Sequence, residues 1–420
     1  MLVAVLIFCL LFSWISFKDL KLSLYLIIAF LPSYLIRFTL FNIPFTFLEV
    51  MIIIAFVLFL LQYKFSWWKN FTTHTFFWPI ISILIIALFS AIISPNFISG
   101  AGIWKAYFLE PILFYVLFIN IIKSKRDLQN VFWSLGFSAL YLSLISLGQF
   151  FSSWNMPTAF LKSDGSVDRV VSIFGYPNAL GLYLGPVIIL FIGFFFWSKD
   201  KTILQILKII IILFSFITII LAKSEAAILS VIGVLVLWGL ICKKTRYYFL
   251  VLTVLSVLIF IFMPVVSSYL TEKVLLQDYS GFIRRLIWSE SWNMLKDNWF
   301  LGAGLAGYQT RIAPYHLPTF EIFLYPHNII LNFWSELGLL GLMAFIWLLA
   351  KFLWKNVVDY WKNNHNLISL TLALVMIQLL IHGLVDAPYF KNDLSVLFWL
   401  VIGFYTINKN LQIMEKCQSG

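Results

Sequence analysis

Long apolar segments recur along the whole chain, and they constrain its fold more than any other feature. We identify thirteen of them, at residues 2–17, 22–36, 47–63, 76–94, 106–122, 128–151, 177–197, 203–222, 226–242, 247–266, 329–350, 367–385 and 394–408. A helix of about 20 apolar residues crosses a hydrocarbon core of about 30 Å. The segments do not alternate in polarity as the strands of a membrane β-barrel do. The chain is therefore predicted to be an all-α polytopic membrane protein with about 12–13 transmembrane helices.

The composition agrees with this prediction. Of the 420 residues, 62% are hydrophobic, 19% are aromatic and only 11% are charged, whereas about a quarter of the residues in a soluble domain are charged. The net charge of +11 has a topological explanation, because the short cytoplasmic loops of membrane proteins are enriched in Lys and Arg. We therefore expect the protein to interact with the lipid bilayer, and we do not expect it to bind nucleic acid.

The distribution of the basic residues predicts an orientation. The short connectors on one side of the membrane hold seventeen Lys and Arg residues, from Lys18 to Lys416. Those on the other side hold six, namely Arg37, Lys105, Lys162, Arg169, Lys223 and Lys391. We predict that the more basic side is cytoplasmic, with the C-terminus inside and the N-terminus outside. The segment 2–17 is kept as a span, because it lacks the charged start and the cleavage site of a signal peptide.

Cysteine and histidine residues are scattered. Cys9, Cys242 and Cys417 do not form a disulfide framework. The five histidines, His74, His316, His327, His365 and His382, do not have the spacing of metal ligands. We expect neither a metal nor another cofactor.

His327 is the main candidate for a catalytic residue. It lies in the run Tyr325-Pro326-His327-Asn328, where the longest external connector, 267–328, meets the apolar segment 329–350. An imidazole titrates near neutrality, so that at a boundary between water and membrane it can act as a general base. The alternative is an interfacial anchor or a hydrogen-bonding residue at the start of the helix.

Arg284 and Arg285 lie in a Trp-rich amphipathic stretch of the same connector. We expect its helix to begin at Ser280-Gly281, with both arginines in the first turn, where the helix dipole disfavours cations. A bound anion would offset this cost, and two guanidinium groups beside free backbone N–H groups suit a diphosphate. Contact with lipid headgroups is the alternative. Arg311 is a further basic candidate in this connector.

Arg169 has a similar position in the second long connector, 152–176. It precedes the apolar segment 177–197, in which Pro177 suits the first turn of a helix and Asn178 could donate hydrogen bonds. A local ion pair between Asp168 and Arg169 is the alternative interpretation.

Two further patterns have structural interpretations. The run Gly302-Ala303-Gly304-Leu305-Ala306-Gly307 matches G-x-G-x-x-G, but we predict a turn, because no strand precedes it as in a dinucleotide-binding unit. Glu49, Glu110 and Glu336 lie within apolar segments. Because a carboxylate in lipid is costly, we expect them to face the interior of the bundle.

Three blocks of residues resemble the O-antigen ligase and O-antigen polymerase superfamily of bacterial envelope glycosyltransferases. They are Arg169 with Phe174-Gly175-Tyr176-Pro177-Asn178; Ser280-Gly281-Phe282-Ile283-Arg284-Arg285-Leu286-Ile287-Trp288 followed by Leu301-Gly302-Ala303-Gly304; and His327-Asn328 with Glu336-Leu337-Gly338 and Gly341. The block His382-Gly383-Leu384-Val385-Asp386 is also similar, so that the resemblance covers residues 160–400.

The resemblance implies a GT-C-like, metal-independent glycosyltransferase of the bacterial inner membrane. Its donor would be an undecaprenyl-diphosphate-linked glycan on the extracytoplasmic face, and its acceptor a glycan, a lipid or a protein. It also implies that Arg169 and Arg284 bind the diphosphate, while Arg285 shares or replaces the role of Arg284. His327 would deprotonate the acceptor hydroxyl, and the anomeric carbon would be inverted. Ligase, polymerase and protein O-glycosylation activities all remain open, because they differ in the acceptor.

One position departs from the family pattern. Many relatives have Ser-Arg-Gly-Ala at the turn between segments 203–222 and 226–242, where this chain reads Lys223-Ser224-Glu225-Ala226-Ala227. Lys223 could supply the missing positive charge, whereas Glu225 would repel a phosphate. The secondary candidates for the site are Asn178, Lys223, Arg311, Asn328 and Glu336.

We expect three regions in the chain. They are N-terminal transmembrane helices at 1–127, an O-antigen ligase-like core at 128–408 with external loops at 152–176 and 267–328, and a cytoplasmic tail at 409–420. The alternative function is a transporter or flippase for a lipid-linked or anionic substrate, which would also use internal acids and arginines. The sequence shows no repeated halves of the kind that many transporters have, which favours the enzyme.

Overall fold

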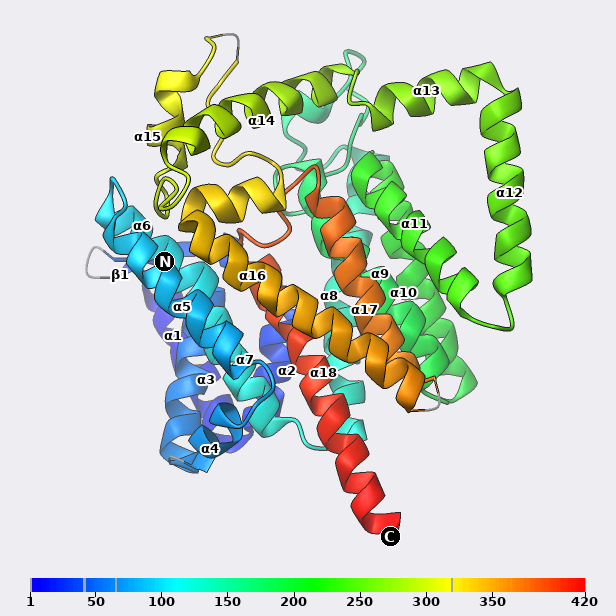
Figure 1. Ribbon diagram of the computed structural model, residues 1–420. Helices are drawn as coiled ribbons and strands as arrows, with labels where there is room; N and C mark the ends of the chain where they lie inside the picture. Colours follow the sequence, from blue (N-terminus) through cyan, green and yellow to red (C-terminus); the bar gives the residue numbers. More distant parts are fainter. Residues whose placement is uncertain (1, 41–42, 65, 319, 364, 420) are drawn as a thin grey trace.

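The computed structural model describes residues 2–40, 43–64, 66–318, 320–363 and 365–419 (Figure 1). Its α-helices are α1 (Leu2–Lys18), α2 (Leu20–Ala29), α3 (Phe47–Tyr63), α4 (Ser66–Thr72), α5 (Phe77–Ile92), α6 (Phe97–Trp104), α7 (Glu110–Ile121), α8 (Lys125–Ser152), α9 (Pro177–Trp197), α10 (Thr202–Leu221), α11 (Glu225–Ile241), α12 (Arg246–Phe262), α13 (Pro264–Val274), α14 (Tyr279–Asp297), α15 (Tyr308–Ile312), α16 (Ile329–Lys362), α17 (Leu367–Gly383) and α18 (Asn392–Ser419). Short 3-10 segments are η1 (Leu31–Leu35), η3 (Thr158–Phe160) and η4 (Ala313–Tyr315), and η2 (Lys105–Leu109) is a π-helical turn between α6 and α7. Strands β1 (Arg37–Leu40) and β2 (Ile43–Thr46) form an antiparallel hairpin.

Each of the thirteen predicted apolar segments overlaps an α-helix, although 22–36 ends in the 3-10 segment η1 and 247–266 is broken between α12 and α13. In the described part of the chain, six helices are long and apolar enough to cross a membrane, and α12 with the bent continuation after it would make a seventh. Six shorter apolar helices of 10–17 residues complete the set. The prediction of an all-α polytopic membrane protein is therefore confirmed.

Helix α9 lies at the centre of the bundle and contacts α8, α10, α11 and α17. Small residues let its backbone approach its neighbours, as in other membrane helix pairs. A Cβ atom on Gly181 would lie 2.3 Å from the Ser224 hydroxyl beside α11, and one on Gly185 would lie 2.5 Å from the Gln378 amide of α17. The Gly181–Gly185 pair is thus a packing motif within the chain.

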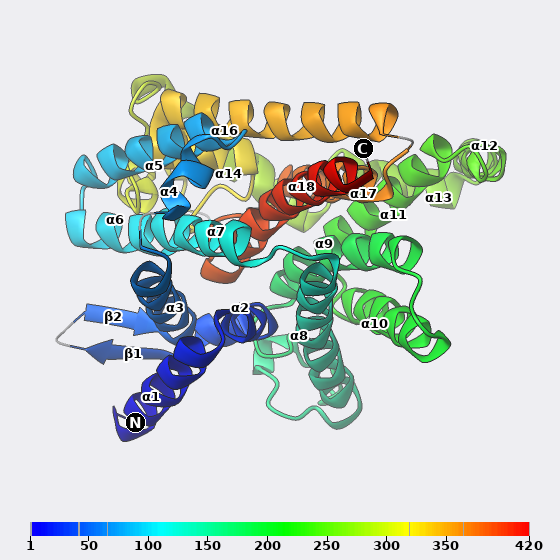
Figure 2. The same ribbon diagram turned by 90° about the horizontal axis from the view of Figure 1, so that it is seen from below.

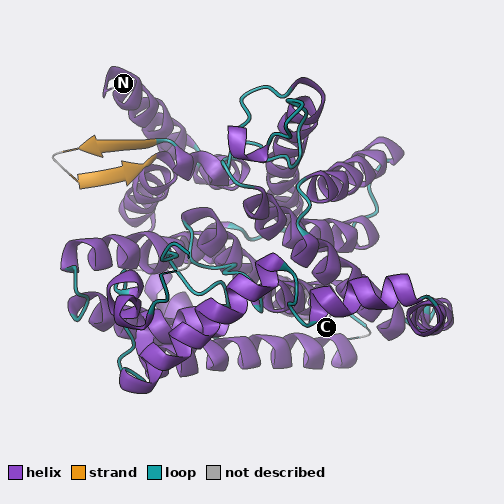
Figure 3. Ribbon diagram, turned by 90° about the horizontal axis from the view of Figure 1, so that it is seen from above, coloured by secondary structure: helices purple, strands orange, loops and turns teal. Residues whose placement is uncertain are grey.

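The long connector between α12 and α16 folds over one end of the bundle. Helices α13, α14 and α15 lie at the top of Figure 1, and Figure 3 shows from above how this connector crosses the ends of the other helices. The Trp288 indole N–H donates to the Pro326 carbonyl (2.9 Å), and the Trp334 indole N–H donates to the Trp299 carbonyl (2.7 Å). These bonds fix α14 against the start of α16.

The glycine-rich run 302–307 is a turn, as predicted. Gly302 and Gly304 have positive φ angles of 68° and 81°, and the Ala303 amide donates to the Ser335 carbonyl at 2.6 Å. The turn packs against a kink in α16 at Gly338, whose φ is 71°. Figure 2 shows α16 running along one side of the molecule, past α5 and α17.

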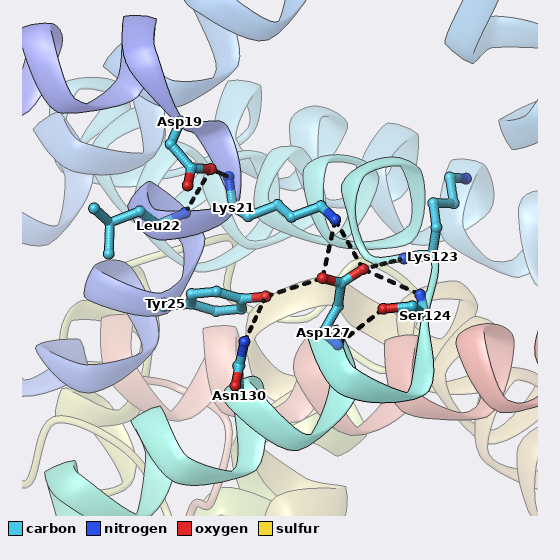
Figure 4. A network of polar contacts seen from close by, with 8 residues as sticks. All are labelled: Asp19, Lys21, Leu22, Tyr25, Lys123, Ser124, Asp127 and Asn130. Carbon is cyan, nitrogen blue, oxygen red and sulfur yellow. Dashed lines mark hydrogen bonds and ion pairs between the residues drawn. The ribbon is translucent and has the colours of Figure 1, made fainter.

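A polar cluster at the opposite end of the bundle joins α2 to α8 (Figure 4). The Lys21 ammonium lies 2.9 and 3.0 Å from the two carboxylate oxygens of Asp127, and Asp127 also accepts from the backbone amides of Lys123 and Ser124. Lys21 and Lys123 belong to two different connectors that we predict to be cytoplasmic. Their meeting at Asp127 agrees with the predicted relative topology, while the side of the membrane stays a prediction.

Candidate functional site

A pocket of about 350 Å³ opens beneath the connector helices. It is lined by residues from the segment before α9, the turn between α10 and α11, helices α13 and α14, and the end of α17. These residues are Arg169, Asn178, Lys223, Ser224, Glu225, Ala226, Leu229, Lys273, Leu276, Asp278, Ser280, Arg284, His382, Val385 and Asp386. We call it the arginine pocket. Segments that are far apart in the sequence therefore bring two of the predicted arginines, Arg169 and Arg284, to one site.

Arg169 is held by its hydrogen bonds. Its Nε donates to the Ala222 carbonyl at 2.9 Å, and its Nη2 donates to the Asn178 amide oxygen at 2.9 Å. Asn178 therefore accepts a hydrogen bond from Arg169 at the start of α9, which begins at Pro177 as expected. The local ion pair of Asp168 with Arg169 does not form. The Asp168 carboxylate instead lies 2.6 Å from the Lys223 ammonium.

Arg284 enters the pocket from α14. Its Nε donates to the Val385 carbonyl at 2.9 Å, and its Nη1 donates to the Ser280 hydroxyl at 2.8 Å. These bonds orient the guanidinium and tie α14 to the turn after α17. Arg285 is exposed and is not among the residues that line the pocket. Of the two adjacent arginines, Arg284 is the one in the site.

The expectation that both arginines lie in the first turn of their helix is wrong. Helix α14 begins at Tyr279, and the Asp278 side chain caps it by accepting from the Gly281 amide at 3.1 Å. Arg284 and Arg285 are therefore in the second turn, beyond the strongest part of the helix dipole. The Asp278 carboxylate already occupies the anionic position at the helix start, so that the dipole gives no separate reason for a bound anion.

Lys273 is a pocket residue that the sequence interpretation missed. Its ammonium lies 3.0 Å from the carboxylates of both Glu225 and Asp278. Glu225, which we expected to repel a phosphate, therefore has a cation beside it. Lys223 likewise has Asp168 beside it. No motif marks Lys273, because its place in the site depends on the bend between α12 and α13.

His327 lies in the turn directly before α16, with a left-handed φ of 49°. Its Nδ1 lies 3.1 Å from the Asp386 Oδ1, and its ring packs against Tyr325 and Phe323, with centroids 5.2 and 5.5 Å apart. In the described part of the chain, Nε2 has no hydrogen-bond partner. His327 is a neighbour of the arginine pocket, because Asp386 both lines the pocket and contacts the imidazole.

Asp386 is the second residue that the sequence interpretation did not assign. Burial would raise the pKa of its carboxyl, but the hydrogen bond with His327, the charges of His327 and His382, and the Ala387 amide lower the pKa to about 2. The carboxylate is therefore ionised at neutral pH and acts as an acceptor. Because the carboxylate can only accept, the hydrogen bond places a proton on His327 Nδ1 and leaves Nε2 as the nitrogen that faces away from Asp386. In the sequence, Asp386 could have been noticed because it follows His382 by four residues at the end of an apolar segment.

The remaining candidates lie outside the arginine pocket. Asn328 caps α16 by accepting from the amides of Ile330 and Leu331, and its amide donates to the Leu384 carbonyl at 2.9 Å. Glu336 is buried within the bundle and accepts from the Ala306 amide at 2.8 Å, which stabilises the glycine-rich turn.

Arg311 lies apart from the other predicted site residues. It lines a separate hollow with Asn298 and Tyr315. The residues that the structure describes contain no group of three or more His, Cys, Asp and Glu side chains that could hold a metal ion.

The fold and the site define a class: a polytopic helical membrane protein with an arginine-lined pocket and an adjacent His–Asp pair at one end of its bundle. Residues 209–346 match the family model described as O-antigen ligase. This range includes Arg284 and His327. The chain is also 23% identical over 370 residues to the O-antigen ligase of Salmonella typhimurium (strain LT2), which covers 83% of this chain and 81% of that protein. Both matches support the resemblance of the chain to the O-antigen ligase superfamily.

This similarity supports a role in glycan transfer at a membrane, as a glycosyltransferase-like enzyme. Lipid-linked glycans are the substrates that the family implies. The multi-pass helical fold agrees with this setting.

Proposed function

We propose that the protein transfers a glycan from an undecaprenyl-diphosphate-linked donor to an acceptor hydroxyl, with His327 as the general base. The observation that carries the proposal is the His327–Asp386 pair at the border of the arginine pocket, with a separation of 3.1 Å. A base and an anion-binding pocket in contact are what a displacement at an anomeric carbon requires. The base activates the nucleophile, and the cations stabilise the leaving group.

The diphosphate is proposed to bind between Arg169 and Arg284. Each guanidinium is oriented by hydrogen bonds from its Nε to a backbone carbonyl, of Ala222 and Val385 respectively. A guanidinium held in this way offers its remaining N–H groups to phosphate oxygens as charge-assisted hydrogen bonds. Two such groups from different segments can contact both phosphates. This role needs no metal ion, because the arginines supply the positive charge.

The proposed step transfers the glycan with inversion. The acceptor oxygen forms a bond to the anomeric carbon while the bond from that carbon to the diphosphate oxygen breaks. The hydroxyl proton passes to His327 Nε2, and the lipid diphosphate leaves with the electron pair. Arg169 and Arg284 stabilise the charge that develops on the leaving group. Asp386 is a positioning residue, because it fixes the imidazole tautomer and stabilises the imidazolium that forms.

The active end is proposed to face away from the cytoplasm, in the cytoplasmic membrane of a bacterium. Support comes from the excess of Lys and Arg in the connectors at the opposite end. A lipid-linked donor that is presented on the outer face would reach the arginine pocket from the bilayer. The acceptor would be a glycan, a lipid or a protein.

Transfer by purified protein tests this proposal. Wild type and His327→Ala are given undecaprenyl-diphosphate-linked oligosaccharide and separate candidate acceptors, in the presence of a chelator. We expect transfer by wild type, and a loss of about 10²–10⁴-fold in kcat for His327→Ala with donor binding retained. Full activity of His327→Ala would exclude the base role. Movement of the lipid-linked substrate across vesicles without transfer would indicate a transporter instead.

A further inference from the structure

Lys391 lies in an aromatic enclosure next to the His327–Asp386 pair. It belongs to the turn between α17 and α18, and its ammonium lies 4.3, 5.4 and 5.5 Å from the ring centroids of Tyr176, Phe174 and Tyr34. We call these four side chains, together with Asp393, the Lys391 enclosure. The turn is not a solvated loop: Asp386, Ala387, Tyr389 and Phe390 are all buried.

Two buried polar atoms in this enclosure have no hydrogen-bond partner within the described residues, namely the Tyr34 hydroxyl and Oδ1 of Asp393. The Lys391 ammonium beside them is half-buried and contacts the three aromatic rings. Tyr34 is only 2% exposed and Asp393 only 1% exposed, so that both are almost completely removed from bulk water. Buried polar groups in native proteins are nearly always hydrogen-bonded, and an unpaired one costs stability. Two such groups beside a lysine ammonium, next to a candidate active site, indicate a site that binds a polar molecule.

The three polar groups of the enclosure differ in their chemistry. Lys391 can only donate hydrogen bonds, ionised Asp393 can only accept them, and the Tyr34 hydroxyl can do both. A ligand that satisfies all three must itself donate and accept at neighbouring positions. The adjacent hydroxyl groups of a sugar ring do this, and the apolar C–H face of a sugar packs on aromatic rings such as Tyr176.

The charges around Lys391 favour a neutral ligand over an anionic one. Burial lowers the pKa of Lys391, and the carboxylates of Asp393 and Asp386 oppose this shift. Two cations, Lys391 and Arg37, thus have two carboxylates within electrostatic range, so that the enclosure has no excess of positive charge for a further anion. The arginine pocket differs from it, since two guanidinium groups face that site.

The enclosure is connected to the proposed base. The Tyr176 side chain, on which Lys391 lies, is a close neighbour of the Tyr325 side chain. The Tyr325 ring in turn packs on the His327 imidazole at 5.2 Å. A sugar that contacts Lys391 and extends along this aromatic wall would present a hydroxyl near His327, on the side of Asp386 away from Arg284.

We propose that the Lys391 enclosure is the acceptor subsite and that it binds a neutral, hydroxyl-bearing sugar ring. The role as acceptor subsite rests on the proposed glycan transfer, whereas the binding of a neutral sugar does not. Lys391 and Asp393 bind adjacent hydroxyls, Tyr34 contributes a third hydrogen bond, and Tyr176 supports the ring.

Direct binding of simple sugars tests this proposal without turnover. The protein in nanodiscs is titrated with methyl glucoside, methyl galactoside and glucuronate, and binding is followed by saturation-transfer NMR. We expect binding of a neutral methyl glycoside, weaker binding of glucuronate, and a loss of at least about tenfold in affinity for Lys391→Met. Lys296→Met is the matched control, because Lys296 is exposed on α14 and hydrogen-bonded to Asn293. Failure of both neutral glycosides to bind, or equal binding by Lys391→Met, would overturn the proposal and leave a site for water alone.

Tyr34→Phe separates binding from folding. Because the Tyr34 hydroxyl has no protein partner among the described residues, its removal should leave the melting temperature unchanged or raise it. A binding role instead predicts about three- to tenfold weaker sugar affinity. A lower melting temperature with unchanged sugar affinity would contradict the proposal.

Transfer kinetics then assign the role of the subsite. Lys391→Met is expected to raise the acceptor KM about tenfold and to leave the donor KM unchanged. A raised donor KM with an unchanged acceptor KM would exclude the acceptor role. If wild-type protein binds the sugar but transfers nothing, the glycan transfer fails while the sugar site stands.

Discussion

His327 Nδ1 lies 3.1 Å from the carboxylate Oδ1 of Asp386, although the two residues are 59 positions apart in the sequence. The imidazole comes from the turn before α16 and the carboxylate from the turn after α17. Asn328 joins the same two segments through its hydrogen bond to the Leu384 carbonyl at 2.9 Å. This second contact helps to hold His327 and Asp386 next to each other. The pair can be tested separately from the arginine pocket.

Asp386→Asn should lower kcat about 100-fold or more, with little change in donor binding. An amide can present its N–H to the imidazole and so reverse the tautomer, which would leave a proton on Nε2. The measurement is single-turnover transfer with saturating donor. Asp297→Asn is a suitable control, because Asp297 lies at the far end of α14, where its carboxylate accepts a hydrogen bond from the Tyr315 hydroxyl. Equal rates for Asp386→Asn and wild type would show that the carboxylate does not position the base.

The same carboxylate should contribute to stability in a pH-dependent way. The pKa of Asp386 is about 2, below its ordinary value of 3.8. The ionised form therefore stabilises the folded protein above about pH 4, by about 2 kcal/mol, and this contribution is lost as the pH falls towards 2. Melting temperatures from pH 7 to pH 2 should fall more steeply for wild type than for Asp386→Asn. Parallel curves would mean that the folded protein does not favour the ionised carboxylate.

Arg284→Gln and Arg285→Gln should behave differently, although the residues are adjacent. Arg284 lines the arginine pocket and is oriented by Val385 and Ser280, whereas Arg285 is exposed outside it. Loss of a charge-assisted phosphate contact costs about 1.5–3 kcal/mol, so that Arg284→Gln should reduce kcat/KM for the donor about 10- to 100-fold. Arg285→Gln should stay close to wild type. The reverse order would move the diphosphate to the outer face of α14.

Glu225→Gln should improve donor binding. Glu225 lines the arginine pocket and pairs with Lys273 at 3.0 Å, so that its neutralisation removes a negative charge and leaves more of the Lys273 charge for the donor. Because the pair is partly exposed, we expect the donor KM to fall only about two- to fivefold, and less at high salt. Donor KM values at several ionic strengths test this. A higher KM would mean that Lys273 needs Glu225 to hold its position.

Gly338→Ala should destabilise the active end of the bundle. Gly338 has a φ of 71°, and a Cβ there would lie 2.2 Å from the Phe300 carbonyl oxygen. We expect a loss of about 2–4 kcal/mol and a lower melting temperature. Gly233→Ala in α11 is the matched control, because a Cβ there meets nothing within 4 Å and alanine favours a helix. Equal melting temperatures for the two variants would contradict the packing argument.

The sequence alone determined the helices and much of the chemistry. Apolar runs long enough to span a bilayer predict helices because no other open backbone arrangement satisfies its hydrogen bonds in lipid, and each of the thirteen runs contains an α-helix. The glycine-rich run 302–307 could be recognised as a turn for a similarly local reason. Arg169 and His327 could be selected because each lies in a connector next to an apolar segment, where an ionised group can reach both water and lipid. Arg284 could be selected because it lies in a Trp-rich amphipathic stretch.

Only the tertiary structure decided how these residues combine. Consecutive residues of a helix are rotated by about 100° about its axis, so that only one of Arg284 and Arg285 faces the pocket. The sequence does not give the orientation of the helix, and so it cannot tell which of the two this is. The partners Asp386 and Lys273 come from segments that meet through packing between distant helices. The turn 386–393 contains several polar residues, yet most of it is buried through contacts with Glu49 of α3, Tyr107 of η2 and Tyr176 before α9. Local sequence fixes secondary structure, but it contains no information about which distant segment will supply the partner of a charge.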